Sequence, residues 1–352
     1  MLPTMSEILQ VAHDAHASDV HITIGLPPMM RVYGRLRKMD FPPLTAEDTR
    51  ALSFQVMTPG QREKFEEDGE YDMSVAVEGL GRYRLNVFKQ RGAVAMALRT
   101  ISIDIPSSES LGVPPAVVEM QHKKRGLVLV TGPTGSGKST TLASILDKIN
   151  TNRDAHIITL EDPIEYMHTH KKSMVNQREV GMDTGSFANA LRAALREDPD
   201  VILVGEMRDF ETIGIAITAA ETGHLVFSTL HTVDAASTID RIIDVFPPHQ
   251  QQQIRVQLSN VLEAIVAQTL VPTIDGDGRV AAFEVLIANH AVRNLVREGK
   301  THQVASILQT NKQAGMQTMD DALLALYMSR KISKDDCIKY AHDSNAMKTK
   351  IL

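Results

Sequence analysis

A glycine-rich stretch between an apolar run and a helix-like segment carries the most specific chemistry in the chain. The glycines allow backbone N–H groups to converge on phosphate oxygens, and the following helix N-terminus adds partial positive charge. Lys138 is expected to reach the β- and γ-phosphates, and Ser139 is expected to hold Mg²⁺. We therefore predict an ATP- or ADP-binding loop rather than a plain turn. Its residues are Gly132, Pro133, Thr134, Gly135, Ser136, Gly137, Lys138, Ser139 and Thr140.

Nucleotide hydrolysis also needs a carboxylate to orient or deprotonate water, usually at the C-terminal edge of a parallel sheet. The apolar run 201–204 ends in Gly205 and Glu206, which puts Glu206 at such an edge. Glycine occupies the position at which a magnesium-binding aspartate is usual. We expect Glu206 to be the catalytic residue, and the alternative is a surface glutamate at a strand end.

A second acidic cluster follows the apolar run 157–160. It contains Glu161, Asp162 and Glu165, and Pro163 stiffens the exit from the strand. A solvated turn would have the same composition, so the pattern alone leaves both interpretations open. Its position after a neighbouring strand favours a role in positioning water or in the outer coordination of magnesium.

His224 and His231 flank the apolar run 225–230. A single histidine is more often structural than catalytic, but two at the ends of one strand make a γ-phosphate sensor or an interface switch an equally good hypothesis.

Arg82, Arg84 and Arg99 lie far from the glycine loop in sequence. In a monomer they would be solvated strand charges. In an oligomer they are candidates to reach the γ-phosphate of a neighbouring subunit.

Composition limits the alternatives. With 352 residues, 43% hydrophobic and 23% charged, the chain is expected to form two globular domains. A net charge of −6 gives no general case for binding nucleic acid or a membrane surface. The single cysteine, Cys337, excludes an internal disulfide and a multi-cysteine zinc site, and it fits a reducing cytoplasm. No apolar run approaches the ~20 residues that span a bilayer, so membrane association is expected only through a partner.

Residues 1–103 are expected to form a small α+β domain. Helices are predicted to begin after Thr4 and to cover 45–57 and 59–67. Strands are predicted over 20–24 and 30–36, followed by a meander over 71–77, 82–89 and 93–101. A segment rich in proline, serine and glycine, 104–115, then reads as a linker.

Residues 116–352 are expected to form an α/β domain. Apolar strands over 127–130, 157–160, 201–204 and 225–228 alternate with helices that begin near 140, 186, 210 and 234. This alternation predicts a parallel sheet covered on both faces. After Gln250 the chain is predicted to be mostly helical, with one strand over 279–287 and a helical C-terminal region over about 288–352.

These motifs together resemble the type IV pilus retraction ATPases of the PilT type, within the secretion ATPase superfamily. The resemblance covers nearly the whole chain. It rests on Ala17-Ser-Asp-Val-His21, the loop 132–140, an aspartate box at 159–166, a degenerate second nucleotide motif at 201–209 and a histidine box at 222–231. The segment Ala291-Val-Arg-Asn-Leu-Val296 differs by two conservative substitutions from the Ala-Ile-Arg-Asn-Leu-Ile signature of retraction motors.

The resemblance implies a RecA-like P-loop ATPase domain behind a smaller PAS-like α+β domain, with C-terminal helices. It also implies a cytoplasmic homohexamer that uses ATP and Mg²⁺ in the cleft between domains. This ring would dock on the inner-membrane platform protein at the pilus base and power retraction and twitching motility. An assembly or type II secretion ATPase is the nearest alternative, but such proteins usually carry an extra N-terminal domain and a four-cysteine zinc module. A regulatory nucleotide switch and a nucleic-acid translocase are more distant alternatives.

Overall fold

The computed structural model describes residues 3–32, 34–101 and 104–351. They fall into two compact units. The first unit is Met1–Asp104 together with Pro163–Met167, and the second is Ile105–Asp162 together with His168–Leu352. The predicted end of the first domain at residue 103 lies outside the described residues. The inclusion of Pro163–Met167 in the first unit had no counterpart in the sequence analysis.

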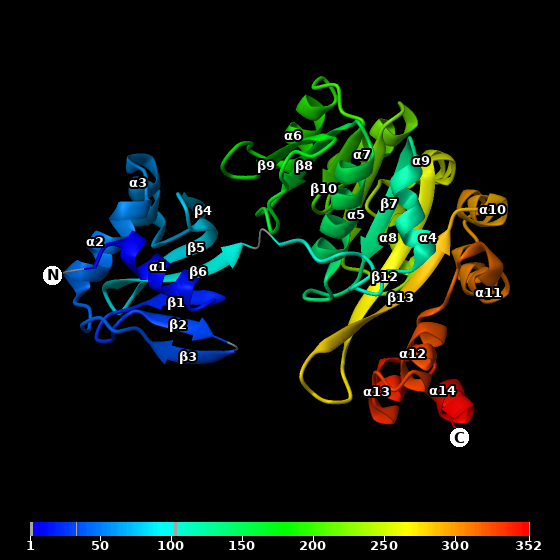
Figure 1. The fold of residues 1–352 in the computed structure, drawn as a ribbon. Helices are drawn as coiled ribbons and strands as arrows, with labels where there is room; N and C mark the ends of the chain where they lie inside the picture. The colour runs from blue at the N-terminus through cyan, green and yellow to red at the C-terminus, as the bar shows by residue number, and fades with distance from the viewer. Residues whose placement is uncertain (1–2, 33, 102–103, 352) are drawn as a thin grey trace. The chain divides into compact units, whose positions relative to one another are not determined.

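The first unit is built on a six-stranded sheet with the order β3-β2-β1-β6-β5-β4, in which all neighbours are antiparallel (Figure 1). The strands are β1 Asp19–Ile22, β2 Met29–Val32, β3 Arg35–Lys38, β4 Glu70–Val77, β5 Gly81–Gln90 and β6 Ala93–Ile101. The meander is confirmed. The single strand predicted over 30–36 is wrong, because Gly34, with φ of 77°, turns the chain between β2 and β3.

Three helices contribute apolar side chains to the core of the first unit: α1 Met5–Asp14, α2 Ala46–Val56 and α3 Pro59–Asp68. Each begins with a capping box, in which Thr4, Thr45 or Thr58 accepts a hydrogen bond from the third helical residue and that residue's side chain bonds back. Such boxes satisfy N–H groups that the helix itself leaves unpaired. Local sequence therefore sets where these helices begin.

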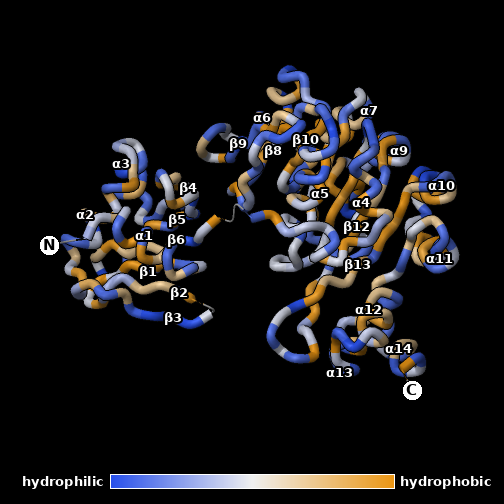
Figure 2. Tube along the Cα trace, in the orientation of Figure 1, coloured by the Kyte–Doolittle hydropathy of each residue, from blue (hydrophilic) through white to orange (hydrophobic). Residues whose placement is uncertain are grey.

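The second unit contains a seven-stranded sheet with the order β13-β12-β7-β11-β10-β8-β9, parallel except for the β12–β13 pair. The predicted strands are confirmed as β7 Gly126–Thr131, β8 His156–Glu161, β10 Val201–Val204 and β11 Leu225–Leu230. In Figure 2 these strands form a hydrophobic interior. Every residue of β7, β10 and β11 is buried, as expected when helices cover both faces of a parallel sheet.

The two faces of this sheet belong to different core clusters. Leu127 and Leu129 pack with side chains of α6 Phe187–Ala194, α7 Phe210–Glu221, α8 Ala235–Asp244, α9 Pro248–Val261 and α10 His290–Glu298. Val128 and Val130 pack with α4 Pro115–Val118 and α5 Lys138–Asn152 on the opposite face. This alternation along β7 follows from the two-residue period of a strand. The predicted α/β fold with a parallel-sheet core is confirmed.

The prediction that the chain is mostly helical after Gln250 is wrong for the residues that follow α9. Leu262–Pro272 form β12, which pairs with β7 on one side and with β13 Arg279–Ile287 on the other. No turn residue separates α9 from β12. The alanines and leucines of β12 also favour a helix locally. Pairing on both sides of the strand overrides that preference. The sequence analysis also missed β9 Met174–Glu179, a largely polar strand at the sheet edge.

The C-terminal helices are α11 Val304–Thr310, α12 Met319–Met328, α13 Lys334–Tyr340 and α14 Ser344–Ile351. The last three share a small core with Val271 of β12 and Ala282 of β13. None of the helices within the described ranges combines the length and the apolar character needed to cross a membrane.

Glu284 of β13 joins the starts of two of these helices. Its carboxylate accepts hydrogen bonds from Ala235 N of α8 at 2.9 Å and from Met319 N of α12 at 3.5 Å. The residue is 4% exposed, and burial raises the pKa of its carboxyl group. Helix N-termini favour negative charge, so this carboxylate fastens α12 to the main core.

We expect Glu284→Leu to lower the free energy of unfolding by about 1–3 kcal/mol, because two buried helix N–H groups would lose their acceptor. Glu284→Gln keeps an acceptor oxygen and is expected to cost less. Urea unfolding followed by circular dichroism measures both. A Leu variant as stable as the Gln variant would contradict this account of Glu284.

Candidate nucleotide site

The glycine loop connects the end of β7 to the start of α5. Gly132, Gly135 and Gly137 have φ values of 140°, 78° and 88°, in a region that side chains other than glycine rarely adopt. A Cβ atom on Gly132 would lie 2.2 Å from the backbone oxygen of Gln268 on β12. The strand, loop and helix therefore have the arrangement predicted from the sequence, and β12 closes the loop from one side.

Lys138, the first residue of α5, folds back over the loop. Its Nζ donates hydrogen bonds to Gly132 O at 2.9 Å and to Pro133 O at 3.1 Å. The hydroxyl of Ser136 is buried without a hydrogen-bond partner among the described residues, and Ser139 follows Lys138 in the first turn of α5. A loop with an ammonium group and the hydroxyls of Ser136 and Ser139 fits a polyphosphate and its cation.

Glu206 lies two residues beyond the end of β10. Its Oε2 is 2.9 Å from Nη2 of Arg208 and 3.6 Å from Nε2 of His231, which directly follows β11. The Glu206 side chain is 20% exposed, so water can reach it. Because β7, β10 and β11 are parallel, their C-terminal ends place the glycine loop, Glu206 and His231 on one edge of the sheet.

Gly205 is favoured by the close spacing of β10 and β8. A Cβ atom at this position would lie 3.1 Å from Leu160 O and 3.4 Å from the Cα atom of Glu161. Gly205 N donates to Leu160 O at 2.7 Å, and Thr229 Oγ1 donates to Gly205 O at 2.6 Å. A side chain at this position would have to push the β8 backbone back by a few tenths of an ångström, which favours glycine at the usual magnesium-binding position.

This geometry is accompanied by similarity to known proteins over most of the chain. The model of the family described as type II/IV secretion system protein matches residues 2–333. The chain belongs to this family.

Three similar proteins match this chain over most of their lengths. The type IV pilus retractation ATPase PilT of Pseudomonas aeruginosa is 50% identical over 332 residues, which cover 94% of this chain and 96% of that protein. A twitching motility protein of Neisseria gonorrhoeae is 50% identical over 320 residues, or 91% and 86% of the two chains. A crystal structure of the pilus retraction motor PilT with bound ADP has 53% identity, 99% coverage of both chains and a TM-score of 0.92. The predicted resemblance to PilT-type proteins is thereby confirmed.

The aspartate box of this secretion-family chain is divided between the two units. Glu161 ends β8, where its Oε1 accepts hydrogen bonds from Thr159 Oγ1 at 2.6 Å and from Gln177 Nε2 at 3.1 Å. Asp162 follows it in the second unit, whereas Glu165 lies in Pro163–Met167 of the first. Within the second unit, the sheet edge that carries Glu206 thus also holds Glu161.

The two histidines of the histidine box lie at opposite ends of β11. A six-residue strand is about 20 Å long. His224 precedes the strand, and its Nδ1 is 2.9 Å from Ala219 O near the end of α7. His224 O also accepts a hydrogen bond from Gly126 N at 3.0 Å. The structure therefore brings His231 to the edge of the glycine loop, while His224 lies at the other edge.

Arg82, Arg84 and Arg99 share one face of the sheet in the first unit. Arg84 and Arg99 are direct neighbours across β5 and β6. Nε of Arg99 lies 2.9 Å from Oδ1 of Asp19, and the Arg99 side chain remains 74% exposed. Burial acts to raise the pKa of the Asp19 carboxyl, but the hydrogen bonds from Arg99 and Ser18 and the positive charges nearby together outweigh it, and the pKa is lowered. Asp19 belongs to the segment 17–21, so that motif holds Arg99 in place.

The signature segment Ala291–Val296 lies within α10, and its arginine points into the protein. Arg293 Nη1 donates to Ser259 O at 2.9 Å and to Asn260 O at 2.7 Å, at the end of α9. Its Nη2 lies 2.9 Å from Oε1 of Glu263, whose Oε2 lies 2.7 Å from Lys123 Nζ. The arginine therefore fastens α10 to the start of β12.

Two polar residues near the site had not been singled out from the sequence. Glu179 ends β9, is 2% exposed and lies beside Glu161 in the β8–β9 register. Gln268 lies in β12 and contacts the glycine loop through its side chain. Both belong to strands that the sequence analysis did not predict. The sequence signal that could have pointed to Gln268 was the presence of a glutamine within the largely apolar segment 262–271.

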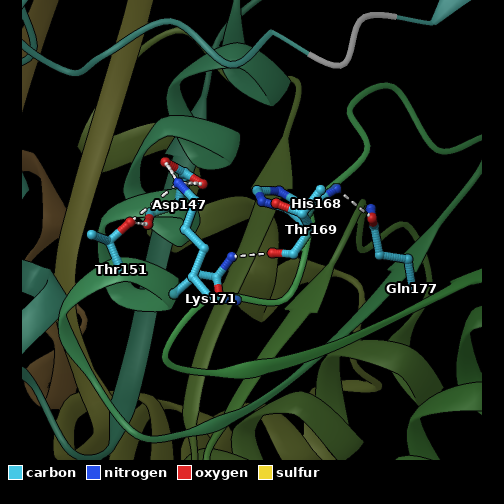
Figure 3. A network of polar contacts seen from close by, with 7 residues as sticks. Asp147, Thr151, His168, Thr169, Lys171 and Gln177 are labelled. Carbon is cyan, nitrogen blue, oxygen red and sulfur yellow. Dashed lines mark hydrogen bonds and ion pairs between the residues drawn. The ribbon is translucent and has the colours of Figure 1, made fainter.

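A polar network fastens the connection between β8 and β9 to helix α5 (Figure 3). Lys171 Nζ lies 2.7 Å from both carboxylate oxygens of Asp147, and Asn150 Nδ2 donates to Thr169 O at 2.7 Å. His168 N donates to Gln177 Oε1 at 2.8 Å, and Gln177 in turn donates to Glu161. The position of Glu161 thus depends on this connection.

Burial lowers the pKa of His168 in this network to about 4. Below the ordinary histidine pKa of about 6.5, the unfolded chain takes up a proton that the folded chain refuses until about pH 4. The contribution of His168 protonation to the free energy of folding is therefore close to zero at pH 7 and becomes unfavourable as the pH falls.

We expect this histidine to cost about 2 kcal/mol of folding free energy between pH 7 and pH 5. His168→Phe should remove that part of the pH dependence, whereas the exposed His302→Phe should leave it unchanged. Urea unfolding of the three proteins at both pH values measures it. Equal pH dependence in wild type and His168→Phe would contradict the prediction.

Proposed function

We propose that this chain is an Mg²⁺-dependent ATPase that works as a homohexameric motor and powers retraction of type IV pili. The observation that carries the proposal is the shared sheet edge of the glycine loop and Glu206. Together they form the phosphate-binding and water-activating parts of an ATPase. Identity of 50% with a pilus retraction ATPase over 94% of the chain supports the mechanical role.

In this proposal residues 132–140 bind ATP and ADP. Lys138 neutralises charge on the β- and γ-phosphates, and Ser139 contributes its hydroxyl to Mg²⁺. No cluster of three or more His, Cys, Asp or Glu side chains arranged for a metal occurs among the described residues. Magnesium commonly retains several waters and uses substrate phosphates as ligands, so one hydroxyl from the protein is sufficient in this type of site.

Glu206 is the proposed base or orienting group for the attacking water. Arg208 and His231 hold its carboxylate, and His231 is placed to respond to the γ-phosphate. Glu161, Asp162 and Glu165 of the aspartate box are proposed to order water around the cation. For His224 we propose a structural role instead, because it bonds to backbone at the far edge of the sheet.

Subunit assembly is proposed to bring Arg82, Arg84 and Arg99 to a neighbouring subunit's nucleotide, where they would stabilise charge in the transition state. The exposure of Arg99 and its fixation by Asp19 support this role. The motor would consist of domains 1–103 and 116–352 joined by the linker 104–115. Successive hydrolysis around the ring would move the domains on their linkers.

The proposed partners are other copies of the chain, the inner-membrane platform protein and the remaining pilus machinery, at the cytoplasmic face of the inner membrane. The absence of a membrane-crossing helix in the described ranges is compatible with peripheral attachment. A net charge of −6 argues against nucleic acid as a partner.

We expect Glu206→Gln to reduce ATP turnover at least 100-fold while ADP binding persists, because the carboxylate acts on water rather than on the bound phosphates. Lys138→Ala should lose both turnover and nucleotide binding. Glu211→Gln, an exposed change of the same type on α7, is the matched control. Phosphate release and fluorescent-ADP titration measure the effects. Normal turnover in Glu206→Gln would remove this residue from the mechanism.

In cells that carry only the Glu206→Gln form, we expect abundant surface pili and no pilus-dependent movement, because assembly would continue without retraction. Electron microscopy and twitching assays measure these two outcomes. Cells without pili would instead indicate an assembly motor. Pili that still retract normally would contradict both motor hypotheses.

A further inference from the structure

Gln268 contacts the glycine loop from the side of β12. Its side chain is almost completely buried, at 3% exposure for the residue. We propose that Gln268 is a positioning residue for nucleotide binding, which sets the direction of the loop's N–H groups without touching the nucleotide. The inference rests on the proposed function of this loop. It adds one residue to the proposed nucleotide site, from a strand that contains none of the motifs named above.

The carboxamide of Gln268 bridges the loop and helix α5. Its Nε2 donates to Ser136 O at 2.8 Å, and its Oε1 accepts from Thr141 Oγ1 at 2.8 Å. Thr141 is itself 1% exposed. The bridge needs one donor and one acceptor on the same planar group, which glutamine supplies and which neither glutamate nor leucine can replace.

The bond to Ser136 O determines where the next N–H group points. The carbonyl of Ser136 and the N–H of Gly137 belong to one planar trans peptide and point in opposite directions. Because the carbonyl is held toward β12, the Gly137 N–H is directed away from it. Convergent N–H groups are what a phosphate loop uses to bind oxygen atoms.

The fit between Gln268 and the loop leaves no room for side chains. A Cβ on Gly132 would lie 2.2 Å from Gln268 O, and a Cβ on Gly137 would lie 2.9 Å from Gln268 Nε2. Two loop glycines are therefore demanded by β12 as well as by the approach of phosphate. The loop and Gln268 form one packed unit.

A positioning role and a purely structural role differ in what a substitution changes. If Gln268 only stabilised the fold, its loss would lower the melting temperature and leave the nucleotide affinity of the folded protein unchanged. If it directs the loop, its loss would weaken ADP binding and raise the KM for ATP, while kcat, which depends on Glu206, would change little.

The test compares the full-length Gln268→Leu and Thr141→Val variants with two controls. Thr269→Val and Ser144→Ala remove hydroxyls from the same strand and the same helix, and the Ser144 hydroxyl is buried without a hydrogen-bond partner among the described residues. Fluorescent ADP gives the Kd, steady-state hydrolysis gives KM and kcat, and thermal unfolding gives the melting temperature.

We expect Gln268→Leu to raise the ADP Kd and the ATP KM about tenfold, with kcat within about twofold of wild type. Thr141→Val, which removes one of the two bonds, should raise them about threefold, and the controls should match wild type.

A folded Gln268→Leu protein with wild-type ADP affinity would overturn the inference. If that variant does not fold, unchanged affinity in Thr141→Val overturns it equally. A wild-type protein that binds no ADP would instead refute the proposed function itself, so the two failures are distinguishable.

Discussion

The close approach of β12 to the glycine loop is the contact on which the rest of the site depends. β12 lies beside β7, so the backbone and side chain of Gln268 meet the loop directly where β7 ends. The contact fixes a peptide of the loop and excludes side chains at Gly132 and Gly137. A flexible glycine segment thereby becomes a rigid one, which reduces the ordering that a bound nucleotide must impose.

The parallel sheet brings the other polar residues of the site together, and it also does so through close packing of neighbouring strands. Parallel strands end on one side, so Glu161, Glu206 and His231 arrive at one edge although they are separated by 25 to 70 residues in the sequence. This proximity favours glycine at position 205, because a Cβ atom there would lie only 3.1 Å from Leu160 O. Cation binding in the proposed motor then relies on Ser139 and the nucleotide rather than on an aspartate.

One strand connects the glycine loop with the segment that resembles the retraction signature. At the start of β12, Glu263 lies between Lys123 and Arg293 of α10; five residues later, Gln268 holds the loop. A Cβ on Gly126, the first residue of β7, would lie 2.4 Å from Glu263 Cγ, so β12 packs tightly against β7 at the start of that strand as well as just beyond its end. The signature arginine thus has a structural explanation within the second unit, because it caps the last carbonyls of α9.

The sequence by itself determined what depends on neighbouring residues: the glycine loop, the strand end at Glu206, the capping boxes at Thr4 and Thr45, and the four apolar strands of the parallel sheet. Only the tertiary structure decided that 262–272 is a strand, that Gln268 reaches Ser136 across 132 residues, and that His224 lies opposite His231. It also decided that Glu165 belongs to the first unit. Capping, turn and periodicity signals extend over about one or two helical turns, whereas strand pairing and buried side-chain bonds join residues that no local pattern relates.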